Sequence, residues 1–96
     1  MRARRTDTNH GDMLTMARDV GAEVLDLHAL PGALDALIGY RGVFYLVEIK
    51  DGAKTKSKRK LTPAEVQTID RFRLIGCPVL VVETTDQLLR AIGAIG

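Results

Sequence analysis

The sequence predicts a small α/β domain in which helices flank a mixed β-sheet. Three observations support this prediction: apolar residues at helical spacing near the N-terminus, a β-hairpin pattern in the middle, and a valine-rich run between two helix-start signals. The 96 residues, 46% hydrophobic and 27% charged, suffice for one core near the lower size limit. We therefore expect a single domain over residues 1–96 with the order α, β, β, β, α, β, α.

The first element is expected to be a helix from residue 9 to about residue 20. Asn9 and Asp12 form a plausible capping pair at its start, and Gly21 ends it. Its apolar residues recur at helical spacing: Met13, Met16, Ala17 and Val20. This stripe predicts an amphipathic helix that packs on the sheet.

Three strands are expected next, over residues 22–28, 35–40 and 43–50. Pro31 and Gly32 mark the loop after the first of them. Arg41 and Gly42 lie between the second and third, as a two-residue hairpin turn. This turn fixes the register of the pair.

The register brings two carboxylates together. The pairs would be Tyr40 with Val43, Leu37 with Leu46, and Asp35 with Glu48. Opposed residues have Cβ atoms about 5 Å apart, so a cation between Asp35 and Glu48 would relieve their repulsion. Lys50 shares their face because residues i and i+2 point to the same side of a strand. The alternative for Glu48 and Lys50 is a surface salt bridge, and a one-residue bulge would remove the opposition.

The second half is expected to contain a capped helix. Thr62 serves as N-cap, Pro63 occupies the first helical position, and Glu65 closes a capping box. The predicted inward stripe is Val66, Ile69 and Phe72. Gly76 ends this helix.

A strand and a final helix complete the chain. The continuous apolar run over 78–83 is typical of a strand buried on both faces. A last helix is expected over 84–95, with Leu88, Leu89, Ile92 and Ile95 directed inward. Cys77 is expected to be a small core or strand-entry residue, and a single cysteine excludes an intramolecular disulfide.

Positive charge is concentrated in two places, although the net charge is only +2. We expect a flexible basic N-terminus over 1–8 and a basic loop over 51–61. The basic residues proposed to contact nucleic acid are Arg4, Arg5, Lys54, Lys56, Lys58, Arg59 and Lys60. Such clusters suit phosphate backbones because each neutralised phosphate releases counterions. The alternative is a solvated loop without a partner.

Composition also bears on location and on other sites. No apolar stretch approaches the roughly 20 residues that cross a bilayer, and no signal peptide is evident, so we expect a cytoplasmic protein without membrane contact. His10 and His28 lack metal-ligand spacing in the sequence, which favours structural roles for both. The small core favours a homodimer.

The order and spacing of these residues resemble a known family. Asp35, a hairpin and then Glu48-Ile49-Lys50 resemble the D…(D/E)xK signature of restriction-endonuclease-like nucleases, the PD-(D/E)xK superfamily. The stretches "GALDALIGYRG", "LVEIKDG" and "LTPAEVQ" resemble VRR-NUC domains, which are similar to Holliday junction resolvases. The resemblance covers nearly the whole chain and implies a restriction-endonuclease-like core. Leu34 stands where the family more often has proline.

The resemblance also implies a site and a cofactor. Asp35, Glu48 and the carbonyl of Ile49 would hold Mg²⁺ or Mn²⁺, which favour oxygen ligands. Lys50 would position or deprotonate the attacking water and stabilise charge on the phosphate. Asp12 would complete the metal shell, or act only as a helix-terminus carboxylate. Gln67 would orient the site, or simply face solvent.

The sequence therefore predicts a Mg²⁺-dependent endodeoxyribonuclease, a phosphodiester hydrolase selective for Holliday junctions or flap-like DNA. A homodimer is expected, since two resolvase sites cut opposed strands. One alternative is a catalytically inactive DNA-binding module. Another is a nuclease subunit that requires a helicase or other DNA-processing partner.

Overall fold

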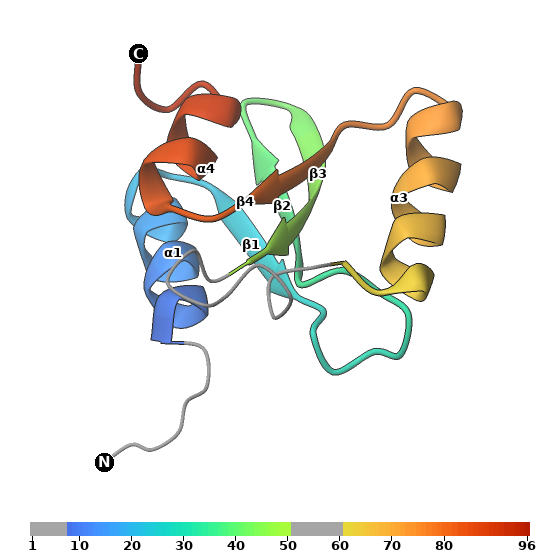
Figure 1. The fold of residues 1–96 in the computed structure, drawn as a ribbon. Coiled ribbons are helices and arrows are strands. Elements are labelled where there is room, and N and C mark those ends of the chain that lie inside the picture. Colours follow the sequence, from blue (N-terminus) through green and yellow to red (C-terminus); the bar gives the residue numbers. More distant parts are fainter. Residues whose placement is uncertain (1–7, 51–60) are drawn as a thin grey trace.

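The computed structural model describes residues 8–50 and 61–96, which form a four-stranded sheet with helices on both faces (Figure 1). The elements are α1 (Thr8–Asp19), β1 (Glu23–Asp26), β2 (Ala36–Tyr40), β3 (Val43–Ile49), α3 (Pro63–Leu74), β4 (Val79–Val82) and α4 (Thr85–Ala91). This is the predicted order, so the α/β fold class is confirmed. The predicted basic contacts at Arg4, Arg5 and the 51–60 segment lie outside the described residues.

The sheet is mixed, as predicted, with the strand order β1-β2-β3-β4. The β1–β2 and β2–β3 pairs are antiparallel, whereas β3 and β4 run parallel. Tyr40 pairs with Val43 and Leu37 with Leu46, which confirms the predicted register. The two turn residues have positive φ, 51° at Arg41 and 83° at Gly42, as a type I′ hairpin turn requires.

The larger core lies between the sheet and the pair of helices α1 and α4. The buried residues of α1 are Met13, Leu14 and Ala17, and those of α4 are Leu88 and Leu89, with Ile92 just after it. The prediction for α1 was wrong at Met16, which is exposed while Leu14 is buried. Ile95 is also exposed, because α4 ends at Ala91 and leaves it beyond the packed face. No helix within 8–50 and 61–96 has the length and apolar content needed to cross a bilayer.

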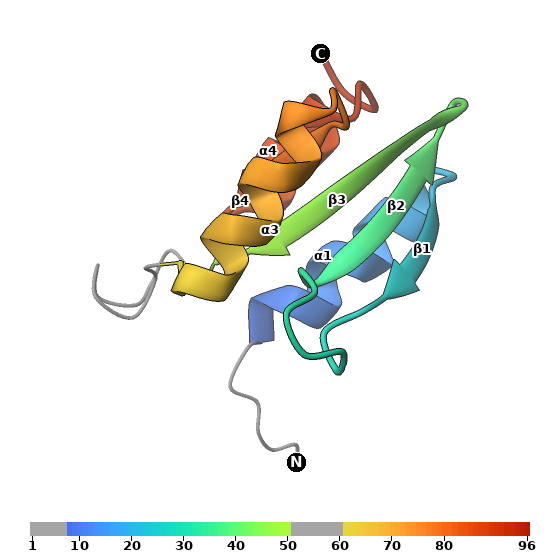
Figure 2. The ribbon, with the colours of Figure 1, turned by 90° about the vertical axis from the view of Figure 1, so that its right-hand side faces the viewer.

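Helix α3 covers only part of the opposite face of the sheet. Its Ile69 packs with Leu34 and Val79 in a second, smaller core. Figure 2 shows that α3 stands over β4 and leaves β1 and β2 uncovered. Val66 and Phe72 of the predicted apolar stripe are therefore exposed, contrary to expectation.

Strand β4 also departs from prediction. Val79 and Val82 are buried, but Val81 is exposed. The physical reason is position: β4 is an edge strand, and the face that carries Val81 is incompletely covered. Val79 packs in the smaller core and Val82 in the larger one, so β4 is buried on both faces at these two residues and departs from the prediction only at Val81.

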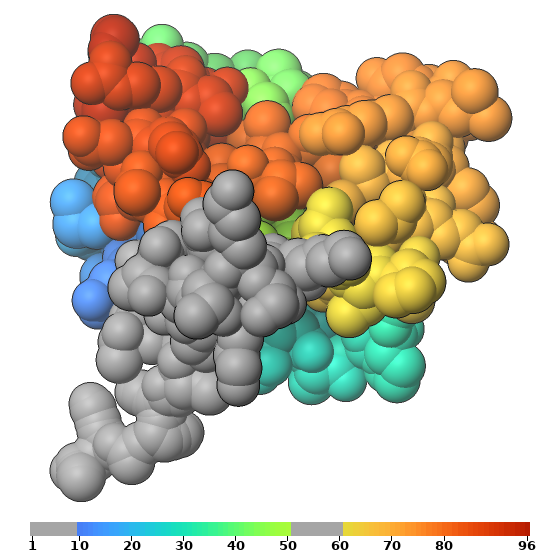
Figure 3. Space-filling model, in the orientation of Figure 1, coloured from blue at the N-terminus to red at the C-terminus, as the bar shows by residue number. Residues whose placement is uncertain are grey.

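The start of α3 is built as predicted. The Thr62 hydroxyl accepts a hydrogen bond from the Glu65 N–H at 3.2 Å, and the Glu65 carboxylate accepts one from the Thr62 N–H at 2.9 Å. The Thr68 hydroxyl donates to the carbonyl of Gly32 at 2.9 Å. This contact holds the loop before β2, teal in Figure 3, against the first turns of α3, in yellow. The start of α3 and the start of β2 are thereby held together.

Candidate active site

Strands β1 and β3 end and β2 begins at the same end of the sheet (Figure 1). Charged side chains gather there. Asp35 directly precedes β2, Glu48 is next to the last residue of β3, and Lys50 directly follows β3. The first turns of α1 and α3 lie at the same end, because His10 approaches Asp35 and Glu65 bonds to Lys50. Four chain segments thus contribute to one small region.

Asp35 is anchored from several directions. Its N–H donates to the carbonyl of Val47 at 3.0 Å, and its own carbonyl accepts from the Leu27 N–H at 2.8 Å. Leu34, which occupies the position before it, is buried in the smaller core. This packing fixes the chain immediately before the carboxylate.

The Asp35 side chain reaches β3 as predicted, although by a different contact from strand pairing. The regular ladder ends at the pair of Ala36 with Val47. Beyond it, the Asp35 carboxylate accepts a 2.7 Å hydrogen bond from the N–H of Ile49, between Glu48 and Lys50. A carboxylate that accepts a backbone N–H bond is held firmly in orientation.

Glu48 is the buried charged residue of the described chain, at 3% exposure. Its Oε2 lies 3.1 Å from the ammonium of Lys50. Its Oε1 is buried and accepts no hydrogen bond from the described residues. Buried polar atoms nearly always have a partner, so this oxygen marks a position where a ligand would be stabilised.

A third carboxylate, that of Glu65, joins this group and was not predicted as a site residue. Lys50 Nζ lies 3.3 Å from Glu65 Oε1, so the ammonium is held between two carboxylates. Glu65 also lies near enough to Glu48 to raise the pKa of that carboxyl. The sequence signal for Glu65 was its capping box, which directs the side chain back toward the start of α3.

The crowding of negative charge appears in the pKa values. Burial, the hydrogen bond with Glu65 and the charge of Asp35 raise the pKa of Glu48 to about 8. Burial would lower the pKa of Lys50, but the hydrogen bonds and charges of Glu48 and Glu65 raise it. Burial would also raise the pKa of Glu65, but bonds to Glu48, Thr62 and Lys50 lower it. Two carboxylates, those of Glu48 and Glu65, therefore flank the Lys50 ammonium, and the charge of Asp35 acts on Glu48 as well.

The group fits a divalent metal ion by its own chemistry. Asp35 and Glu48 supply carboxylate oxygens, the donors that Mg²⁺ and Mn²⁺ prefer. The buried Oε1 of Glu48 without a described hydrogen-bond donor, and the raised pKa of Glu48, are both features that a bound cation would relieve. The carbonyl of Ile49 as a further ligand stays a prediction.

The structure does not bring Asp12 or Gln67 into this group. Asp12 is exposed on α1, whereas His10 lies on the side of the helix that faces Asp35. Gln67 is exposed on α3 and lines a surface hollow with Asp70. Residues two positions apart on a helix point in nearly opposite directions, so the orientation of Glu65 toward Lys50 turns Gln67 away.

A second cluster, of His10, Asp26 and His28, adjoins the first. His28 Nδ1 lies 2.6 Å from Asp26 Oδ1, and His10 Nε2 lies 3.6 Å from Asp26 Oδ2. Burial raises the pKa of Asp26, but hydrogen bonds from the ring and backbone N–H of His28 lower it below the usual value. The sequence favours structural roles for the two histidines, and that stays a prediction, but folding brings both rings to the Asp26 carboxylate. The pair Asp26 and His28, two residues apart at the end of a strand, was the sequence feature that could have indicated this cluster.

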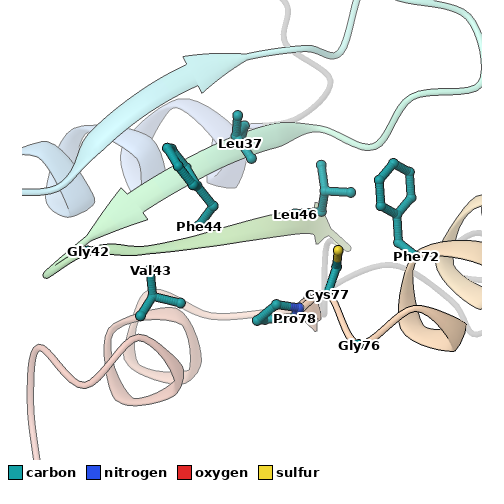
Figure 4. Close-up of a pocket in the computed structure, with 9 residues that line it drawn as sticks. All are labelled: Leu37, Gly42, Val43, Phe44, Leu46, Phe72, Gly76, Cys77 and Pro78. Carbon is teal, nitrogen blue, oxygen red and sulfur yellow. The ribbon is translucent and has the colours of Figure 1, made fainter.

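An apolar pocket of about 380 Å³ lies away from these charges, on the face of the sheet that α3 leaves open. Its lining combines Leu37, Val43, Phe44 and Leu46 from the hairpin with Phe72, Cys77 and Pro78. In Figure 4, Leu46, Phe72 and Cys77 gather at one end of the pocket, and Val43 and Phe44 at the other. Phe44 is 69% exposed, which is unusual for so large an apolar side chain.

Comparison with known proteins identifies the fold. No family model and no curated protein matches the chain. A solved structure described as a "VRR_NUC domain" is similar, with a TM-score of 0.64 and 30% sequence identity. The match covers 88% of this chain and 95% of that one. Shared fold and sequence over almost the full length of that structure show that this chain belongs to the VRR_NUC domain family, a group of nuclease-type domains.

Proposed function

We propose that this protein is a metal-dependent endonuclease that hydrolyses phosphodiester bonds in DNA. The observation that carries the proposal is the gathering of Asp35, Glu48 and Lys50 at one end of the sheet. A buried Glu48 oxygen that accepts no hydrogen bond from the described residues lies within this group. Membership of a nuclease-type family supports the same conclusion.

In this proposal, Asp35 and Glu48, with the carbonyl of Ile49, hold Mg²⁺ or Mn²⁺. The bound metal would act as a Lewis acid and lower the pKa of a water molecule. Asp35 is oriented for its part by the 2.7 Å hydrogen bond from Ile49. Glu48 is oriented by Lys50 and by its burial in the strand.

Lys50 is the proposed charge-stabilising group. An ammonium has three protons, and two of its hydrogen-bonding directions are taken by Glu48 and Glu65 at 3.1 and 3.3 Å. In the proposal, the third proton would hold a water molecule or a phosphate oxygen. Glu65 is then a positioning residue, because it gives the ammonium a second carboxylate contact beside that of Glu48.

DNA is the proposed substrate, and the basic segments are its proposed contacts. Residues 51–60 join Lys50 to Leu61, and residues 1–7 precede α1, so both are covalently attached at the end of the sheet where the acidic group lies. Lys54, Lys56 and Lys58 would compensate phosphate charge close to the metal. Preference for branched DNA is a further part of the proposal, and dependence on a helicase-like partner is an alternative to it.

A second copy of the chain is the proposed occupant of the apolar pocket. Its lining contains no charged side chain, so it does not suit a phosphate backbone. A chain of 96 residues has a small core, and a large exposed phenylalanine beside a pocket is typical of a protein contact. The surface lies on a different part of the molecule from the acidic group, so a dimer would leave both sites accessible.

The decisive experiment is cleavage of a labelled four-way DNA junction beside a matched linear duplex, with Mg²⁺, Mn²⁺ or EDTA. The unmodified chain would be compared with Glu48→Gln and with Asp70→Asn, an exposed control on α3. Metal-dependent cutting that Glu48→Gln loses and Asp70→Asn keeps would support the nuclease. Tight DNA binding without cutting in any metal would instead support the inactive binding module or a missing partner.

A further inference from the structure

We propose that His10, Asp26 and His28 form a second metal site, which takes a divalent transition-metal ion such as Zn²⁺ or Co²⁺. Each residue offers one ligand atom, and these atoms all lie within 4.8 Å of one another. The site is distinct from the pair of Asp35 and Glu48. Its existence does not depend on the proposed nuclease activity.

Three segments of the chain build this cluster. His10 comes from the first turn of α1, Asp26 is the last residue of β1, and His28 follows in the loop. The Asp26 carboxylate lies between the two rings: His28 approaches one oxygen at 2.6 Å and His10 approaches the other at 3.6 Å. The rings meet edge to face, with centroids 5.5 Å apart. Both imidazoles are thus directed at one carboxylate.

The spacing is close to what a small ion needs. A tetrahedral ion with ligand bonds of about 2.1 Å separates its ligand atoms by roughly 3.4 Å. His10 Nε2 lies 3.6 Å from Asp26 Oδ2, near that value, whereas His28 Nδ1 is hydrogen-bonded to Asp26 Oδ1 at 2.6 Å and would move outward to admit an ion. His28 is 64% exposed, so its ring has room to turn toward an ion.

The donor set determines the class of ion. Two imidazole nitrogens and one carboxylate favour Zn²⁺, Co²⁺ and their neighbours over Mg²⁺, which prefers oxygen. Three protein ligands leave a fourth position for water or another small ligand. The ion expected here therefore differs in kind from the one expected at Asp35 and Glu48.

A local turn does not account for the whole cluster. The His28 N–H donates to Asp26 Oδ1 at 3.1 Å, which is the contact of an ordinary turn after a strand. That contact concerns one oxygen of Asp26 and neighbours in sequence. It does not explain why His10, a residue from another element with only 13% of its side chain exposed, approaches the second oxygen.

The two groups are adjacent through His10. Its Nδ1 lies 3.8 Å from Asp35 Oδ1, while its Nε2 faces Asp26. The other Asp35 oxygen is already bonded to the Ile49 N–H. An ion at the second site would therefore lie one side chain away from the proposed catalytic carboxylates.

Co²⁺ titration of the metal-free full-length chain tests the proposal without reference to activity. Visible absorption of bound Co²⁺ reports nitrogen and oxygen ligands in a site of low coordination number. We expect one equivalent of Co²⁺ to produce this spectrum, Zn²⁺ to abolish it by displacement, and excess Mg²⁺ to leave it unchanged.

Matched variants locate the ion. His28→Ala changes an exposed side chain and should weaken Co²⁺ binding more than about tenfold, the smallest loss expected even for groups that merely orient a ligand. Asp26→Asn should weaken it similarly. Asp19→Asn, an exposed carboxylate on α1, should have no effect. Glu48→Gln should keep the Co²⁺ spectrum even though the proposed nuclease would be inactive.

Three results would overturn the second site. The first is no Co²⁺ spectrum at millimolar metal with the folded, unmodified chain. The second is a spectrum that survives both His28→Ala and Asp26→Asn. The third is a spectrum lost in Glu48→Gln but kept in His28→Ala, which would place the ion among the other carboxylates. None of these results depends on whether DNA is cut.

Discussion

The carboxylate of Asp35 accepts a 2.7 Å hydrogen bond from the backbone N–H of Ile49. This bond joins the start of β2 to the end of β3 beyond the last regular pair of their ladder. It places one acidic side chain against the residue that separates Glu48 from Lys50. One proposed metal ligand, Asp35, is therefore oriented by the backbone of the strand that carries the other, Glu48.

Asp35→Ala should destabilise the protein by about 1–2 kcal/mol, because a hydrogen bond to a charged group is lost at a partly buried position. Asp35→Asn should cost less, since its amide oxygen can still accept the Ile49 N–H and its neutral side chain removes repulsion with Glu48. Urea unfolding in EDTA would measure both variants. Equal destabilisation by the two would contradict this account of the bond.

Metal-free stability should fall as the pH rises from about 5 to 9. The pKa of Glu48 is raised in the folded protein to about 8 from its ordinary value of 4.5, so its contribution is fully present below 4.5 and is lost as the pH rises through 8. Glu48→Gln cannot ionise and should show a flatter dependence in thermal unfolding with EDTA. Asp70→Asn, which is exposed, should retain the slope of the unmodified protein.

Addition of Mg²⁺ or Mn²⁺ at pH 8 should raise the unfolding temperature of the unmodified chain. An ion that binds only the folded state at 100 times its dissociation constant contributes about 2.7 kcal/mol. Glu48→Gln should lose most of this increase, because the buried oxygen proposed as a ligand becomes part of a neutral amide. An equal increase in both proteins would place the ion elsewhere.

Lys50→Ala should lower DNA cleavage by at least about 100-fold, since a group that stabilises transition-state charge is worth roughly that much. Glu65→Gln should lower cleavage less, about tenfold, because the amide oxygen still accepts from Lys50 without a full charge. The glutamine side chain in this variant can also close the capping box with Thr62, so helix α3 should stay stable. Single-turnover cleavage and circular dichroism would separate the two effects. Full activity in Lys50→Ala would remove this residue from the mechanism.

Phe44→Ser should weaken self-association, because it removes the most exposed aromatic side chain beside the apolar pocket. Sedimentation of the unmodified chain should show a dimer whose dissociation constant rises at least about tenfold in the variant. Leu25→Ser changes an exposed apolar residue outside the lining and serves as the control. A monomer at high micromolar concentration before any substitution would contradict the proposed dimer.

Two glycine substitutions should have opposite effects on stability. Gly42→Ala forces a side chain into φ of 83° in the hairpin turn and should cost about 1–2 kcal/mol. Gly11→Ala lies in α1 with nothing within 4 Å of the added methyl group, and should contribute about 0.5–1 kcal/mol of stability. Chemical unfolding of both variants measures the contrast. A stable Gly42→Ala would mean that the turn can change its type.

Local signals in the sequence were sufficient for the order of the elements and for the hairpin register. The two-residue turn at Arg41 and Gly42 restricts the backbone strongly, so the pairing of Leu37 with Leu46 followed from sequence positions alone. The capping box of Thr62 and Glu65 is likewise a contact within one turn of a helix. Such features depend on neighbouring residues, which is why no tertiary information was needed.

The extent of burial required the tertiary structure. Val66, Phe72 and Val81 have the spacing or composition of buried residues, yet all three are exposed. Periodicity shows which residues share a face, but it does not show how much of that face another element covers. Here α3 covers only part of the sheet, and how much it covers is set by packing between distant segments.

Some residues of the candidate site could likewise be predicted from the sequence, whereas others required the tertiary structure. The sequence alone determined that Asp35, Glu48 and Lys50 come together, because a hairpin of known register carries all three. Only the tertiary structure decided that Glu65 joins them in place of Gln67, and that His10, Asp26 and His28 meet. These residues come from elements whose relative placement is set by packing across the sheet, and no spacing along the chain encodes that placement.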